Sequence, residues 1–207
     1  MTRIDSVSQS PDRSGRYLVK FSDGSTMRLF RQTVEDFRLY PGMELDNLDA
    51  LRESNSRYSA KMRAVRIISA SSVSKRDLES RLVRKGESEE QAKEAVKWLS
   101  DLNLLDDRQT ARQIVERCVH KGYGIQRAKQ ALYEKQIPKS LWEEALEDYP
   151  DQTDAIAAFL RTKLRDPDDP KQVKRAIDAA LRRGHSYGEV KRALEMIGTE
   201  SQFEEDY

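Results

Sequence analysis

An internal repeat constrains this chain more than any other feature of its sequence. When the sequence is shifted by 98 positions, Arg84-Lys85-Gly86 falls on Arg182-Arg183-Gly184, and Ser88 falls on Ser186. A shift of 50 positions also places apolar residues on apolar residues, with Leu132 opposite Leu82. A period near 50 residues with three helical segments per unit predicts tandem three-helix modules, stacked into an elongated and somewhat curved array.

The helices of one repeat carry their own start and stop signals. Ser88 with Gln91 forms a capping-box pattern, and the apolar residues that follow lie on one helical stripe. Lys85-Gly86 is typical of a helix end, and Asp106-Asp107 of the next helix start. Read in this way, the chain contains nine helices after the N-terminal region. They are expected at 58–68, 78–85, 88–102, 107–120, 125–135, 138–149, 154–165, from Asp169-Pro170 onward, and 187–197.

The first 56 residues follow a different pattern. Two short runs with strand character, at 16–21 and 25–30, flank Ser22-Asp23-Gly24, which indicates a hairpin. A further strand is possible at 3–7, and a short helix is expected at 33–39, with Thr33 and Asp36 in capping-box positions.

The chain is therefore expected to be mainly α-helical, with three three-helix modules preceded by a small β-rich module. The predicted divisions are a β-rich module at 1–56, helical modules at 57–105, 106–150 and 151–198, and an acidic tail at 199–207.

Composition indicates the cellular compartment and the kind of partner that this chain would bind. The sequence holds one cysteine, so it forms no internal disulfide, and it shows neither a signal peptide nor a membrane span; a cytoplasmic location is expected. Residues 57–136 contain 18 lysines and arginines against 11 acidic residues, a net charge of +7, whereas residues 137–207 carry −5. A polyanionic partner would prefer the middle of the chain, although ordinary solvated helix faces give the same counts.

The residues needed for catalysis are missing. His120 and His185, the only histidines, have no partners at zinc-site spacing, and no phosphate-binding loop is present. Cys118 falls on an apolar stripe and is expected to be buried, while Trp98 and Trp142 are expected to pack rather than to stack on bases. We expect no enzymatic activity, no metal and no cofactor.

Basic residues on the outer faces of the helices are the candidate binding residues. A few cations per repeat suit a long, regular polyanion, either a nucleic-acid backbone or an acidic groove of a protein filament wound around nucleic acid. The candidates are Arg81, Arg84, Lys85, Arg108, Arg112, Arg117, Lys121, Arg127, Lys129, Lys174, Arg175, Arg182 and Arg183.

Several of these segments resemble the signature of RecX regulatory proteins. The resemblance covers about residues 57–198 and is most specific at Trp98-Leu99-x-x-Leu102-x-Leu104-Leu105-Asp106-Asp107, followed by Gly122-x-Gly124. Gln136 departs from the glycine expected at the end of a helix near Lys135. Three tandem three-helix modules are the architecture of that family, and its longer members carry an N-terminal extension.

The resemblance implies a modulator of the RecA recombinase. Such a protein lies in the groove of the RecA–single-stranded DNA filament, limits filament growth and ATP hydrolysis, and takes part in the control of DNA repair, recombination and the SOS response. We expect a monomer that contacts RecA and can also contact single- or double-stranded DNA. Two alternatives stay open, a stand-alone DNA-binding protein of helix-turn-helix type and a structural helical adaptor.

Overall fold

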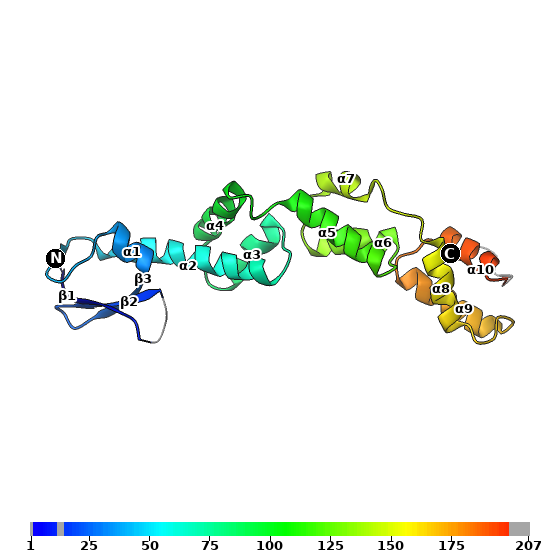
Figure 1. Cartoon of the computed structure of the whole chain (residues 1–207), viewed down its shortest axis with the longest axis horizontal. Helices are drawn as coiled ribbons and strands as arrows, with labels where there is room; N and C mark the ends of the chain where they lie inside the picture. Colours follow the sequence, from blue (N-terminus) through cyan, green and yellow to red (C-terminus); the bar gives the residue numbers. More distant parts are fainter. Residues whose placement is uncertain (1, 12–14, 199–207) are drawn as a thin grey trace. The chain divides into compact units, whose positions relative to one another are not determined.

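The computed structural model describes residues 2–11 and 15–198, so the predicted acidic tail lies outside the described residues. The chain divides into two compact units, residues 1–105 and 106–207 (Figure 1).

The N-terminal module is an antiparallel sheet with the strand order β3-β2-β1-β4. Its strands are β1 (Thr2–Gln9), β2 (Arg16–Phe21), β3 (Thr26–Phe30) and β4 (Glu44–Leu45). The predicted hairpin is confirmed: Gly24 has a φ of +79°, and the Asp23 carboxylate accepts a hydrogen bond from the Ser25 amide at 2.8 Å. The two-residue strand β4 was not predicted, because it is too short to show alternation.

The short helix after the sheet begins earlier than predicted. Helix α1 (Arg31–Asp36) follows Phe30 directly and has no side-chain cap. The expected capping residue, Thr33, is instead fully buried within the helix. The capping pattern at Thr33 was therefore wrong, because the turn of the chain out of β3 already sets the start of this helix.

The first long helix also starts earlier than predicted. Helix α2 (Leu48–Ala70) is capped by Asn47, whose side chain accepts hydrogen bonds from the Asp49 and Ala50 amides. One continuous helix thus crosses the predicted division at 56/57. Its first half buries Leu51 in the core of the sheet module, and its second half buries Ala60 and Ala64 in the core of the first helical module.

The first helical module is completed by α3 (Lys75–Arg84) and α4 (Glu89–Asp101). Ser88 caps α4 as predicted, accepting a hydrogen bond from the Gln91 amide at 3.2 Å. The second half of the capping box is absent, because the Gln91 side chain accepts a hydrogen bond from Ser56 instead.

The second unit contains the two remaining modules. Their elements are α5 (Asp107–His120), α6 (Ile125–Glu134), η1 (Lys139–Leu141), α7 (Trp142–Leu146), α8 (Thr153–Lys163), α9 (Pro170–Arg182) and α10 (Tyr187–Met196). The helix predicted at 138–149 is shorter than expected, since it opens as a 3₁₀ turn and ends at Leu146. Gln136 takes a φ of +53° and ends α6 in the conformation that glycine provides in the other modules.

The predicted fold class is confirmed: a small β-rich module precedes three modules of three α-helices. Each module has its own buried core, and the largest buried side chains include Leu78, Leu82, Leu132 and Leu160. None of the helices in the described parts of the chain is long and apolar enough to cross a bilayer.

Candidate functional site

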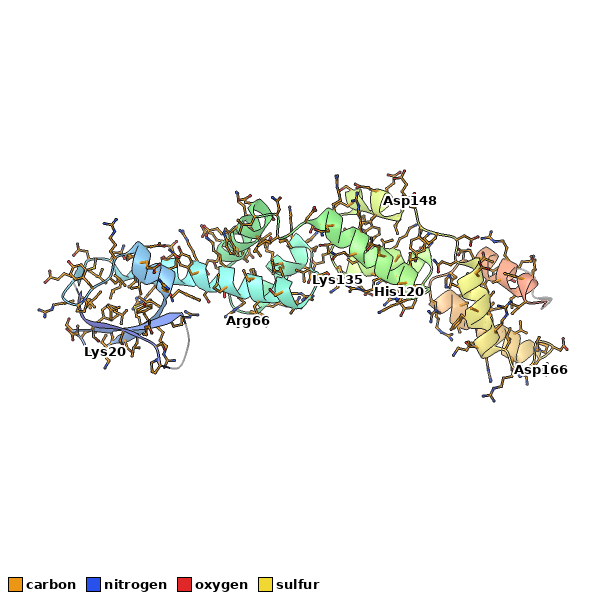
Figure 2. All side chains as sticks on the ribbon, in the orientation of Figure 1. Lys20, Arg66, His120, Lys135, Asp148 and Asp166 are labelled. Carbon is orange, nitrogen blue, oxygen red and sulfur yellow. The ribbon has the colours of Figure 1, made fainter. Side chains whose placement is uncertain are left out.

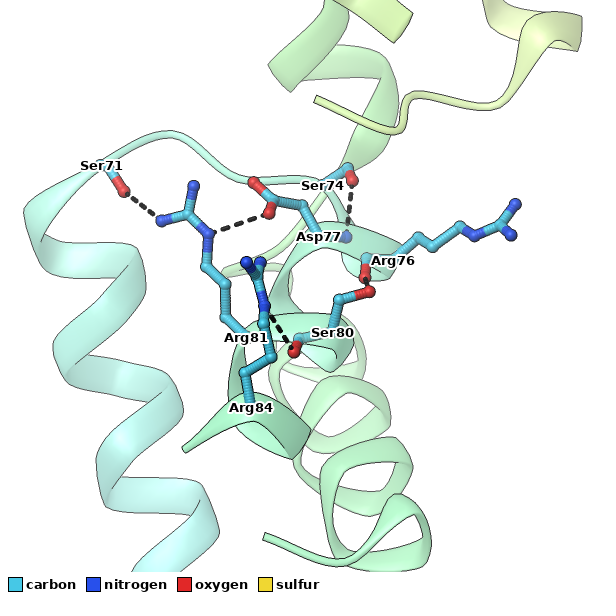
Figure 3. A network of polar contacts seen from close by, with 7 residues as sticks. All are labelled: Ser71, Ser74, Arg76, Asp77, Ser80, Arg81 and Arg84. Carbon is cyan, nitrogen blue, oxygen red and sulfur yellow. Dashed lines mark hydrogen bonds and ion pairs between the residues drawn. The ribbon is translucent and has the colours of Figure 1, made fainter. Parts of the chain in front are cut away.

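Two of the three candidate cations of the first module, Arg81 and Arg84, form hydrogen bonds within that module (Figure 3). The Arg81 Nε lies 2.9 Å from the Asp77 carboxylate, which is buried, and the Arg81 guanidinium also reaches Ser71 Oγ at 3.4 Å. Arg84 Nε donates to the Ser80 carbonyl at 3.3 Å. Lys85 is exposed at the helix end.

Helix α5 divides its cations between two sides. Arg108 and Arg112, one turn apart, both pair with Glu144 of α7, at 3.3 and 2.7 Å. Arg117 and Lys121 are also one turn apart, on the opposite flank of the buried stripe of α5. In residues 2–11 and 15–198 no carboxylate lies within ion-pair distance of Arg117 or Lys121.

The side of α5 that carries Arg112 faces a groove of about 490 Å³, which α7 lines from the other side. Figure 2 labels two of its lining residues, His120 near the end of α5 and Asp148 after α7. Glu116 and Glu144 line it as well. This side of the second module is therefore mainly acidic, and a polyanion would not favour it.

The other flank of α5 is basic. The charges of Arg127, Lys121 and Arg117 all act on the thiol of Cys118, which places the three around the C-terminal end of α5. Burial raises the pKa of the Cys118 thiol in spite of these cations, so the thiol stays protonated as a packing group. Arg127 pairs with Glu134 at 3.2 Å, and Lys129 is half-buried on α6.

The cations of the third module serve two different purposes. Lys174, Arg175 and Arg182 are exposed on α9. Arg183 instead reaches the second module, where its guanidinium donates to the Lys121 carbonyl at 2.5 Å. The guanidinium carbon also lies 5.0 Å from the centre of the Tyr123 ring and 4.7 Å from the centre of the Phe159 ring, which belongs to α8 of its own module.

The Arg183 contact belongs to a joint between the second and third modules, which we call the 2–3 joint. It consists of the α5–α6 loop, Gly122 to Gly124, and the α9–α10 turn, Arg183 to His185. The Gly124 amide donates to the Arg183 carbonyl at 2.9 Å, and the Gln126 amide to the Gly184 carbonyl at 3.2 Å. A β-carbon on Gly124 would lie 2.0 Å from the Gly184 oxygen, so the two main chains cross too closely for any side chain.

His185 closes the joint from the inside. It is 4% exposed; its Nε2 lies 3.1 Å from the Gly122 carbonyl, and its Nδ1 is buried with no hydrogen-bond partner in the part of the chain that the structure describes. Because a carbonyl can only accept, Nε2 carries the proton of a neutral ring. Burial lowers the pKa of His185, in agreement with that neutral form. Tyr149 adds a hydrogen bond from its hydroxyl to the Tyr123 carbonyl at 2.6 Å.

Known proteins resemble the chain over nearly all of this architecture. The profile described as "RecX, second three-helix domain" matches residues 106–146. The "Regulatory protein RecX" of Vibrio parahaemolyticus is 27% identical over 139 residues, which are 66% of this chain and 90% of that protein. The protein of the same name from Clostridioides difficile is 26% identical over 205 residues, 95% of each chain. The chain belongs to the RecX family.

A solved structure agrees with this assignment at the level of the fold. The crystal structure of a regulatory protein RecX superposes with a TM-score of 0.69 at 21% identity, covering 97% of this chain and all of that one. The RecX profile covers α5 to α7, the elements that present Arg117 and Lys121. The relatives are named as regulatory proteins. No group of three or more potential metal ligands occurs in the described portion of the chain.

The sequence-predicted binding residues thus differ in whether they have partners within the molecule. Arg81, Arg108, Arg112, Arg127 and Arg183 have intramolecular partners, whereas Arg117, Lys121 and the α9 cations point outward. The sequence analysis did not identify the 2–3 joint. Its one available signal was a histidine directly after the turn glycine, where the first module has Glu87 and the second has Ile137.

Proposed function

We propose that this protein binds the RecA–single-stranded DNA filament, limits filament growth and lowers its ATP hydrolysis. Membership of a family of regulatory proteins supports a regulatory rather than a catalytic activity. The proposal rests on Arg117 and Lys121. They are cations beside the 2–3 joint that have no ion-pair partner among the described residues, and they belong to the module matched by the RecX profile.

The contacts across the joint support binding along a filament. Two main-chain hydrogen bonds and the Arg183 contacts hold the second and third modules together, so cations of α5 and α9 are presented by one preformed body. A preformed surface loses less conformational entropy on binding than a flexible chain does.

The structure gives less support to stand-alone binding of duplex DNA. The third helix of the second module, α7, carries Glu143 and Glu144 in its first turn and no lysine or arginine. In a helix-turn-helix arrangement this kind of helix would approach the phosphate backbone with the wrong charge.

The test is RecA ATPase on single-stranded DNA, with this protein titrated from far below to equal to the RecA concentration. We expect a falling rate at substoichiometric ratios. Replacing Arg117 and Lys121 together by alanine should raise the concentration needed for half-inhibition roughly tenfold, equivalent to about 1.4 kcal/mol of binding free energy.

Arg108→Ala with Arg112→Ala is the matched control, because it removes two charges from the same helix, and both of these arginines already pair with Glu144 of α7. It should change inhibition little. Equal losses in both double variants would mean that net charge alone acts, and no inhibition at equimolar protein would refute the proposal. DNA binding without any effect on RecA would favour the stand-alone reading.

A further inference from the structure

Unit 1 contains a groove of about 640 Å³ that the proposed function does not use. Helices α1, α2 and α4 contribute its walls, together with the end of β3. Three aromatic side chains, one methionine and two cations dominate the lining: Phe30, Tyr58, Trp98, Met62, Arg31 and Lys61. Its volume lies in the range of about 300–1,000 Å³ that small-molecule sites occupy.

Contacts outside the groove fix the positions of its aromatic side chains. The Tyr58 hydroxyl donates to the Asp36 carboxylate at 2.6 Å, and this hydrogen bond raises the pKa of Tyr58 to about 12, so the phenol stays neutral and fixed. Trp98 packs with one side against the core of the first helical module, as the sequence predicted, and lines the groove as well. The Arg16 guanidinium lies 3.1 Å from the centre of the Phe30 ring.

A positive charge lies among these rings. The Lys61 ammonium is 5.7 Å from the centre of the Tyr58 ring and 5.4 Å from that of Trp98. The nearby carboxylates have other partners: Glu35 pairs with Arg31 at 2.6 Å, and Asp36 accepts from Tyr58 and from Gln32. Within the described residues no carboxylate forms an ion pair with Lys61. The groove therefore offers flat apolar surfaces next to a cation.

An extended peptide is a poorer fit than a nucleic-acid strand. The outer edge of β3 would be the natural place for a peptide to add as a strand, but Asn55 of α2 occupies it. The Phe30 amide donates to Asn55 Oδ1 at 2.8 Å, and Asn55 Nδ2 donates to the Arg28 carbonyl at 3.4 Å. Ring faces beside a lysine are the means by which proteins bind unpaired bases and the adjoining phosphate, with little dependence on sequence.

We propose that this groove binds single-stranded nucleic acid, with an unstacked base against Trp98 and Met62 and the adjoining phosphate on Lys61. Duplex is excluded because its bases are paired and stacked within the helix. The site shares no residue with the Arg117 and Lys121 surface and requires no recombinase. This proposal can therefore be tested independently of the proposed function.

The chain has two tryptophans, which makes a site-specific experiment possible. In the full-length Trp142→Phe variant, Trp98 is the only indole. Titration with a short oligothymidylate should quench Trp98 fluorescence saturably, and an equal concentration of duplex should not. Lys61→Glu should weaken this binding at least fivefold, within the range that one stacked and charged contact accounts for.

Lys97→Glu is the matched control. Lys97 precedes Trp98, is 76% exposed and pairs with Asp101 outside the groove, so the same change of charge there should have little effect. Met62→Ala supplies a second, uncharged test and should also weaken the quench. Fluorescein anisotropy of the oligonucleotide measures the same affinities without relying on the indole.

Three results would overturn the inference: no quench at saturating oligonucleotide, equal effects of Lys61→Glu and Lys97→Glu, or a Trp98 response to RecA alone with none to oligonucleotide. The last would make the groove a protein-binding site. Arg117→Ala with Lys121→Ala should leave the Trp98 quench unchanged, which separates a failure here from a failure of the proposed function.

Discussion

The turn between the last two helices is built from nearly the same residues in the first and third modules, yet its surroundings differ between the two. Lys85-Gly86-Glu87 and Arg183-Gly184-His185 both place a glycine with φ near +90° after the helix, and a capping serine follows each turn. At Gly86 an added β-carbon would meet nothing within 4 Å, whereas at Gly184 it would lie 2.3 Å from the Arg127 amide. One turn only reverses the chain; the other also joins two modules.

The arginine contacts of the two turns run in opposite directions. In the first module Arg63 of α2 donates to the Lys85 carbonyl and pairs with Glu87 at 3.2 Å, so the turn receives an arginine from its own module. In the third module the turn supplies its own Arg183 to carbonyls at the end of α5. Under the 98-residue shift the residue opposite Arg183 is Lys85, so the joint coincides with an arginine at a position where the first module has a lysine.

The largest expected difference between the two turns is steric. Gly184→Ala should destabilise the second unit by about 2–5 kcal/mol, because a left-handed backbone and a main-chain clash are added together. Gly86→Ala should cost the first unit only the backbone term, about 1–2 kcal/mol. Urea unfolding measures both, with Trp142 reporting the second unit in a Trp98→Phe background and Trp98 the first in Trp142→Phe.

Gly124→Ala separates the two causes. Gly124 has an ordinary negative φ of −75°, so alanine there adds the clash with the Gly184 oxygen and no backbone strain. It should still destabilise the second unit strongly. If Gly184→Ala and Gly86→Ala cost the same, or Gly124→Ala costs nothing, the close crossing of the main chains is not what holds the modules together.

A smaller difference is expected from the arginines. Arg183→Ala removes hydrogen bonds to two carbonyls and the contacts with Tyr123 and Phe159, and should destabilise the second unit by about 1–3 kcal/mol. Arg183→Lys should recover only part of this, because a single ammonium cannot reproduce the planar fork. The same urea unfolding assay measures the effect of both Arg183 variants on the stability of the second unit. Arg182→Ala is the control, because Arg182 is one residue away and exposed, and it should change that stability little.

Local signals in the sequence predicted most of the helix ends and none of the joint. Ser88, Ser186 and Asp169-Pro170 cap helices as expected, since a cap involves residues within one turn of each other. Helical periodicity shows which face of a helix is buried but not which neighbouring module covers it. Arg84-Lys85-Gly86 and Arg182-Arg183-Gly184 are nearly the same in sequence, so only the three-dimensional structure separates the exposed turn from the joined one.

The same reasoning explains the errors at the N-terminal side. The helix predicted at 58–68 rested on apolar periodicity alone, whereas α2 begins at Leu48 behind the side-chain cap of Asn47. The candidate cations were chosen by their position on helix faces, which does not reveal that Glu144 lies opposite Arg108 and Arg112. Ion pairs between elements that are distant in sequence depend on packing, which a single sequence does not display.

The smallest expected difference is a dependence on pH, present in the third module because its turn carries His185 where the first carries Glu87. Burial lowers the folded-state pKa of His185 below the ordinary value of 6.5; Arg183 acts in the same direction, while Glu189 and the Gly122 carbonyl oppose it. Below pH 6.5, His185 therefore binds a proton in the unfolded chain but stays neutral in the folded chain until the pH reaches its lower folded-state pKa. The stability that this histidine contributes is complete above pH 6.5 and falls as pH drops toward the folded pKa, by at most about 1.4 kcal/mol per pH unit.

Urea unfolding followed by Trp142 between pH 5 and 8 measures this dependence, and His185→Gln should flatten it, because glutamine can donate to the Gly122 carbonyl without titrating. A profile that His185→Gln does not alter would mean that carboxylates cause the acid sensitivity. A profile that it flattens would show that the joint, rather than either module alone, limits the stability of the second unit in mild acid.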